Sequence, residues 1–170
     1  DKTIEDEYSS VEWILILYNF YVILEKLVNK EDDSSAAYII TEIYELIELS
    51  IIHNSIAEIK YSINLLVEIR KMAIIHKLNI TSSLCGLYIA KTFIAGIVYE
   101  NDSTINESWM ALEKIANKAK DEDFIPKKGL IKAFEWILAY MQSLSDTNSE
   151  LIEFNEKIQS YIDNLNDDDD

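Results

Sequence analysis

Glycine and proline are nearly absent from this sequence, which contains three glycines and one proline among its 170 residues. Tight turns between β-strands depend on these two residue types, so a chain built of many short strands would need more of them. Long helices joined by a few loops do not. The hydrophobic fraction of 49% is high enough to form a compact core. The sequence therefore predicts a soluble all-α protein, and its length is typical of one domain.

Apolar residues recur at helical spacing in six or seven segments that are separated by polar breaks. The least charged segment is 84–99, where Lys91 is the one residue with a charged side chain. Gly86 and Ala90 are four residues apart, so another helix can approach this segment closely. We therefore predict a globular bundle of six to seven helices around a buried central hydrophobic helix at about residues 84–99. This segment is short for a membrane span, and we expect the ammonium group of Lys91 to reach water or an acidic neighbour.

The apolar run Trp13–Leu24 predicts a second buried helix, because it is apolar on nearly all sides. We expect this helix to begin near Ser9 or Ser10 and to end near Lys30. The mostly polar segment Asn79–Ser83 predicts a break between helices. The landmarks of a 34-residue tetratricopeptide repeat are missing from the sequence.

Two segments match the capping box, in which a hydroxyl and a carboxylate satisfy free amides at a helix start. They are Thr104–Glu107 and Thr147–Glu150. The one proline lies in the segment Asp121–Lys128, which we predict to be a loop. We assign residues 1–165 to a single helical domain and residues 166–170 to an acidic, disordered tail.

The charge balance is strongly acidic, with 15 basic and 31 acidic residues and a net charge of −16. Such a surface repels nucleic-acid phosphates and anionic lipids, so we expect neither direct nucleic-acid binding nor membrane binding. A protein partner, basic or helical, is compatible with it. The single cysteine, Cys85, excludes an internal disulfide and favours a cytoplasmic location. Because Cys85 lies in an apolar run, we expect it to be buried and not a nucleophile.

Arg70 and His76 are the strongest candidates for chemistry. An arginine and a histidine separated by four to six residues resemble the signature of the HEPN ribonucleases, which are all-α. The resemblance implies that His76 handles a proton at a ribose hydroxyl while Arg70 steadies phosphate charge. The sequence departs from the family pattern at Lys71, where a polar residue usually follows the arginine. The alternative is that Arg70 lies at the edge of the core or is paired inside it, and that His76 lies at a helix end.

Other reactive patterns are missing from the sequence. His53 with Glu48 and Glu58 suggests a metal site, but the Glu-x-x-His pattern of carboxylate-bridged metal sites does not occur. Two histidines and one cysteine offer few zinc ligands, and the glycines form no phosphate-binding loop. We therefore expect no catalytic, cofactor-binding or metal-ligating residues.

By elimination, the sequence favours a non-enzymatic, helical protein-interaction module. The abundance of isoleucine, asparagine, aspartate and tyrosine indicates an AT-rich microbial or viral genome. Viral Bcl-2-like proteins are similar at the level of fold alone, because they are all-α with a buried central helix and a groove for a partner helix. Their Asn-Trp-Gly-Arg motif is missing here. Two alternatives stay open: the HEPN-like ribonuclease, and an acidic mimic of nucleic acid that uses Glu42, Glu45, Glu48 and Glu58.

Overall fold

The computed structural model describes residues 2–144 and 149–167, and in these residues it contains seven α-helices and no β-strand. This confirms the predicted all-α class. The helices are α1 (Lys2–Asn29), α2 (Asp33–Ile52), α3 (Ile56–Ile75), α4 (Asn79–Val98), α5 (Asp102–Ala119), α6 (Phe124–Ser143) and α7 (Ser149–Asn166).

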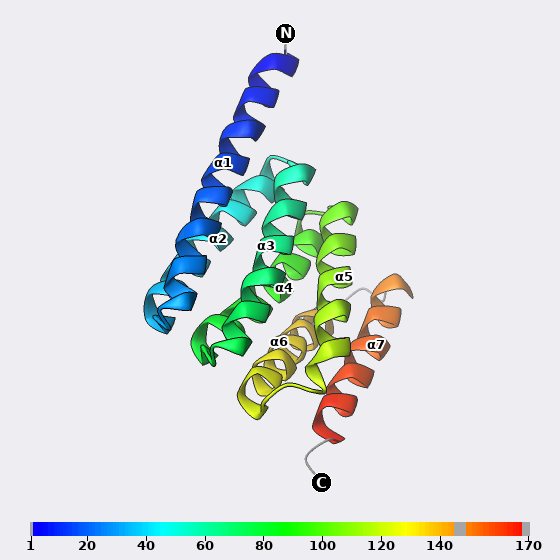
Figure 1. Ribbon diagram of the computed structural model, residues 1–170. Helices are drawn as coiled ribbons and strands as arrows, with labels where there is room; N and C mark the ends of the chain where they lie inside the picture. The colour runs from blue at the N-terminus through cyan, green and yellow to red at the C-terminus, as the bar shows by residue number, and fades with distance from the viewer. Residues whose placement is uncertain (1, 145–148, 168–170) are drawn as a thin grey trace.

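The helices form two rows (Figure 1). Helices α1, α3 and α5 lie side by side in the first row with α7 at its end, and α2, α4 and α6 form the second row behind it. From α1 to α6, each helix packs against its neighbours in the chain, and α1 to α4 also pack against the next helix of their own row. The buried side chains of both rows form one connected hydrophobic core.

Helix α4 is the central helix, as predicted, because it packs against α2, α3, α5 and α6. Ile89, Ala90 and Phe93 are fully buried in it. A Cβ atom added to Gly96 would lie 3.0 Å from the backbone nitrogen of Ile105, so only glycine permits this approach of α5. Among the described residues, α4 is the one helix long and apolar enough to cross a membrane, but 56% of that stretch is buried, as in the core helix of a globular fold.

The turns that follow the first four helices are alike and recur at a fixed interval. Each contains one residue with φ between 51° and 58°, and these residues follow one another at intervals of 23: Glu31, Asn54, Lys77 and Glu100. In the third turn, Lys77 N donates to Ile74 O (3.1 Å) and Leu78 N donates to Ala73 O (2.8 Å). This Schellman pattern satisfies the last carbonyls of the helix, and the equivalent bonds recur in the other three turns.

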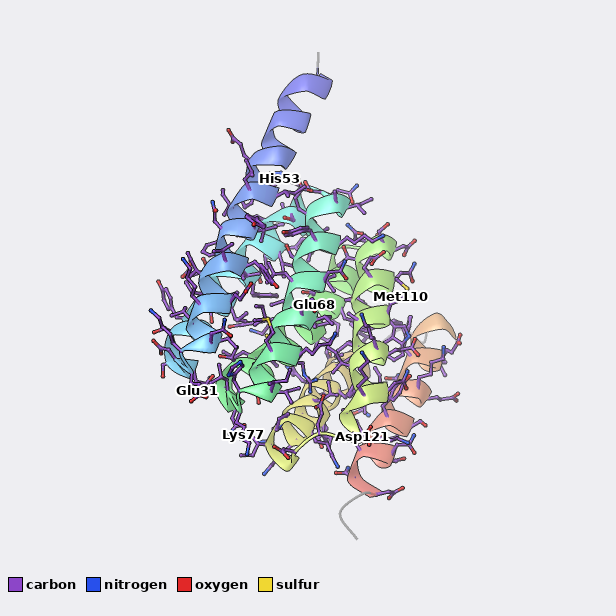
Figure 2. The ribbon with its side chains drawn as sticks, viewed as in Figure 1. Glu31, His53, Glu68, Lys77, Met110 and Asp121 are labelled. Atoms are coloured by element: carbon purple, nitrogen blue, oxygen red, sulfur yellow. The ribbon has the colours of Figure 1, made fainter. Side chains whose placement is uncertain are left out.

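Because each unit is one helix and one turn, successive turns lie at opposite ends of the molecule. Figure 2 shows Glu31, Lys77 and Asp121 at one end and His53 at the other. The part of the fold from α1 to the start of α5 therefore repeats a helix and a turn with a period of 23 residues, which differs from the 34-residue period of tetratricopeptide repeats.

Replacing Glu100 by glycine is expected to raise the free energy of unfolding by about 1 kcal/mol. A left-handed conformation costs an L-residue about 1–2 kcal/mol, and the Glu100 carboxylate lies unfavourably near the negative end of the α4 dipole. The greater freedom of glycine in the unfolded chain offsets part of this gain. Urea unfolding measures the effect. The control is Glu45→Gly within α2, which should cost about 1 kcal/mol, and equal effects at both positions would contradict the expectation.

The prediction of a second helix buried on several sides is wrong for α1. Leu15 is 56% exposed and Tyr18 is 53% exposed, although Leu17 and Leu24 are buried. The reason is that α1 lies at the end of the first row, where α2 and α3 are its main packing partners in the described part of the chain. The helix also begins at Lys2, well before the predicted caps.

The predicted break at Asn79–Ser83 is also wrong, because Asn79 is the first residue of α4. The amides at this helix start are satisfied from another helix. The carboxylate of Asp33, at the start of α2, accepts hydrogen bonds from Ile80 N (2.9 Å) and Thr81 N (2.8 Å). The central helix is therefore capped by a tertiary contact.

Other predicted helix boundaries shift by a few residues. Asn101 caps α5 by accepting a hydrogen bond from Thr104 N (3.0 Å), so Thr104–Glu107 is not a capping box. Pro126 lies in the first turn of α6, where a missing amide costs little, so the predicted loop ends earlier. The box at Thr147–Glu150 and most of the tail at 166–170 lie outside the described residues, and α7 extends to Asn166.

Candidate functional site

Arg70 is buried and pairs with Glu122. Its Nη1 lies 2.7 Å from Glu122 Oε1 and its Nη2 lies 2.7 Å from Glu122 Oε2. The two side chains are only 5% and 11% exposed. The planar guanidinium matches the carboxylate with two parallel hydrogen bonds. This confirms the alternative in which Arg70 is paired inside the core, with a partner from the turn between α5 and α6.

His76 lies elsewhere. It is the C-terminal cap of α3, and its Nδ1 is 3.9 Å from Oε1 of Glu31 in the turn between α1 and α2. Arg70 thus contacts the turn that follows α5, whereas His76 contacts the turn that follows α1. Within one copy of the chain, Arg70 and His76 therefore have different acidic neighbours, Glu122 and Glu31.

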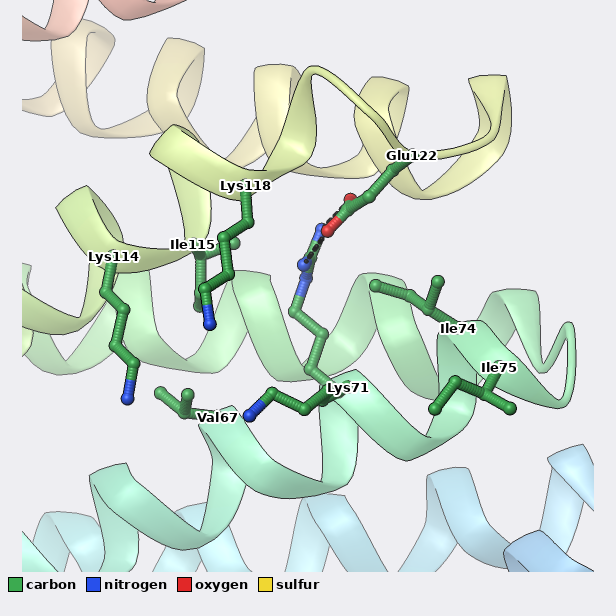
Figure 3. A pocket seen from close by; sticks show the side chains of 9 residues that line it. Val67, Lys71, Ile74, Ile75, Lys114, Ile115, Lys118 and Glu122 are labelled. Carbon is green, nitrogen blue, oxygen red and sulfur yellow. Dashed lines mark hydrogen bonds and ion pairs between the residues drawn. The ribbon is translucent and has the colours of Figure 1, made fainter.

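A pocket of about 230 Å³ opens between α3 and α5, next to the Arg70–Glu122 pair (Figure 3). Apolar side chains of Val67, Ile74 and Ile115 line it, together with Ile75 at its edge. Three lysines, one from α3 and two from α5, complete the lining: Lys71, Lys114 and Lys118. In Figure 3 their ammonium groups gather around Val67 and Ile115. We call this the lysine pocket.

The electrostatics of the lysine pocket are opposite to those of the whole chain. Its lining contains four cations and one anion, Glu122, which is already paired with Arg70, whereas the chain has a net charge of −16. Lys114 and Lys118 form no ion pair with any residue in the described part of the chain. Lys71 Nζ lies 3.6 Å from Oε1 of Glu68. Both side chains are half-exposed, and an ion pair at such a surface is weak. The pocket can therefore bind an anion that is attached to an apolar group.

The comparisons with known proteins assign the chain to no family. No protein-family model, no curated protein and no solved structure matches it. The resemblances to HEPN ribonucleases and to viral Bcl-2-like proteins therefore stay predictions from the sequence.

The other candidates from the sequence do not form a site. Glu45 and Glu48 are exposed on α2, but Glu58 is only 4% exposed, so the predicted acidic face is interrupted. Within the described residues, no group of three or more histidine, cysteine, aspartate or glutamate side chains is placed to hold a metal ion. Cys85 is buried, as predicted, and burial raises the pKa of its thiol to about 12, so it carries no thiolate at neutral pH.

Lys91 has surroundings that the sequence did not indicate. Its Nζ lies 5.4 Å from the ring centre of Tyr44, 5.5 Å from that of Tyr88 and 5.2 Å from that of Trp136. The ammonium group therefore makes cation–π contacts to rings of α2, α4 and α6, which were not predicted from the sequence. These contacts join the three helices of the second row.

The residues of the lysine pocket were also missed. Lys114 and Lys118 are four residues apart and therefore share a helix face, which the sequence shows. Their convergence with Lys71 could not be read from it, because it depends on α3 and α5 being neighbours in the first row.

Proposed function

We propose that this chain is a non-enzymatic helical-repeat protein that binds a protein partner. The observation that carries the proposal is the lysine pocket, an apolar recess on a protein that is otherwise strongly acidic. Three lysines rim it, and two of them, Lys114 and Lys118, have no ion-pair partner in the described part of the chain. Rows of stacked helices commonly present their binding surfaces in this way, since neighbouring helices leave grooves between them.

The size of the pocket favours a protein partner over a small metabolite. Small-molecule sites usually enclose about 300–1,000 Å³, whereas this pocket measures about 230 Å³. A cavity of about 150 Å³ holds a benzene ring, so the lysine pocket is large enough for one bulky side chain.

The charge of the surface favours a protein over a nucleic acid. Nucleic-acid binding depends on neutralising many phosphates along a strand, and the net charge of −16 opposes this outside the pocket. Arg70, which the ribonuclease alternative needs for phosphate, is already paired with Glu122.

The proposal is tested by capturing partners from extracts of the source cells with the immobilised chain, identifying them by mass spectrometry, and measuring direct binding of the purified proteins. We expect at least one partner to bind with a dissociation constant near or below the micromolar range. In parallel, labelled RNA is incubated with the wild type and with His76→Ala. RNA cleavage that is lost in a folded His76→Ala variant, or the failure of every captured protein to bind directly, would contradict the proposal.

A further inference from the structure

We infer that the lysine pocket binds an acidic amphipathic segment of the partner protein. One large apolar side chain of the segment enters the pocket, and carboxylates on either side of it pair with Lys71, Lys114 and Lys118. This inference rests on the proposed function and adds the chemistry of the partner and the surface that recognises it.

The apolar part of the recognition follows from the walls of the pocket. Val67 and Ile74 from α3 face Ile115 from α5, so an inserted side chain meets apolar surface from both helices. The Arg70–Glu122 pair is part of the same lining, and its two parallel hydrogen bonds leave the guanidinium already matched to a carboxylate. The recess thus selects a compact apolar group and not a second charged one.

The acidic part follows from the rim. Lys114 and Lys118 lie one turn apart on the exposed side of α5, and Lys71 lies across the pocket on α3. A helical segment places residues three and four positions from its central side chain on the same face, one turn before it and one turn after it. Glutamates at those positions can reach lysines on both sides of the pocket. Lys114 and Lys118 have no ion pair in the described part of the chain, so they can bind these glutamates without breaking one.

The experiment uses fluorescein-labelled synthetic helical peptides and fluorescence anisotropy with the full chain. The test peptide contains one phenylalanine with glutamates three and four residues to either side. Two matched peptides replace the phenylalanine by alanine or the glutamates by glutamine. We expect each replacement to weaken binding about tenfold or more, and high salt to weaken binding of the acidic peptides only.

Two protein variants locate the binding surface. Lys114→Glu/Lys118→Glu should weaken binding of the test peptide at least about tenfold, because it places two carboxylates at the rim. Its control is Lys26→Glu/Lys30→Glu, which makes the same change in net charge at exposed lysines of the α1 end and should leave binding within about twofold. Val67→Phe fills the pocket without changing the charge. This variant should bind the phenylalanine peptide no more tightly than the wild type binds the alanine peptide.

Several outcomes would overturn the inference. Equal affinities for the phenylalanine and alanine peptides would show that the peptide is held by its charges and that no side chain enters the pocket. Equal losses of peptide affinity in the two double variants would show that only the net charge of the protein matters. Displacement of the peptide by a short RNA would show that the lysines bind anions in general. If the partner protein still binds Lys114→Glu/Lys118→Glu, the inference fails while the proposed function stands. If Val67→Phe does not fold, the exposed lysine variants decide the question.

Discussion

Replacing Glu122 by alanine is expected to lower the free energy of unfolding by about 3–5 kcal/mol. The substitution leaves the Arg70 guanidinium, which is 5% exposed, without the carboxylate that accepts both of its short hydrogen bonds. A buried charge without a partner costs several kcal/mol, and arginine cannot escape the cost by losing its proton. Urea unfolding followed by circular dichroism measures the change.

Two further variants separate this cost from other effects of the substitution. Arg70→Met/Glu122→Leu should recover most of the lost stability, since apolar residues of similar volume replace a buried ion pair at little cost. Glu68→Ala removes the half-exposed carboxylate beside Lys71 and should cost no more than about 0.5 kcal/mol. If Glu122→Ala and Glu68→Ala have similar effects, the Arg70–Glu122 pair is not buried in solution.

Replacing Asp33 by alanine is expected to lower the free energy of unfolding by about 3 kcal/mol. Its carboxylate accepts three hydrogen bonds from the start of α4: from Ile80 N at 2.9 Å, Thr81 N at 2.8 Å and Thr81 Oγ1 at 2.7 Å. The N-cap position of α4 is Leu78, whose side chain accepts no hydrogen bond. Hydrogen bonds to a charged group contribute about 1.5–3 kcal/mol each, less than additively when they share one acceptor.

The neighbouring residue provides a matched control. Asp32 caps α2 through one exposed hydrogen bond, accepted from Ser35 N at 3.1 Å, so Asp32→Ala should cost about 1 kcal/mol. Asp33→Asn keeps an acceptor oxygen and should be intermediate between Asp33→Ala and the wild type. Equal effects of Asp32→Ala and Asp33→Ala would mean that Asp33 does not hold α2 and α4 together.

The 23-residue repeat left a trace in the sequence that local periodicity did not reveal. The helix ends Ile51-Ile52-His53, Ile74-Ile75-His76 and Ile97-Val98-Tyr99 are similar, and a small residue precedes each of them: Ser50, Ala73 and Gly96. The fully buried positions Ile43, Leu66, Ile89 and Leu112 recur with the same interval. Such a repeat is faint because each position needs only a suitable size and polarity, which several residues provide.

The features that the sequence determined by itself are those that depend on composition and on spacing along one helix. The all-α class followed from the scarcity of glycine and proline, and the central position of α4 followed from its nearly uncharged, apolar run around Cys85. A helix of this length with a single charged side chain, Lys91, needs cover on most sides in an acidic chain, whichever helices provide it.

The tertiary structure alone decided which helices are neighbours. It gave Arg70 a partner 52 residues away in Glu122 and gave α4 its cap from Asp33, and it left one side of α1 exposed. It also brought Lys71 to the same pocket as Lys114 and Lys118. The hydrophobic effect that drives helices together is non-directional, so an amphipathic pattern says that a face is buried without saying against what. The Arg70–Glu122 pair, the Asp33 cap and the lysine pocket all depend on which helices pack against each other.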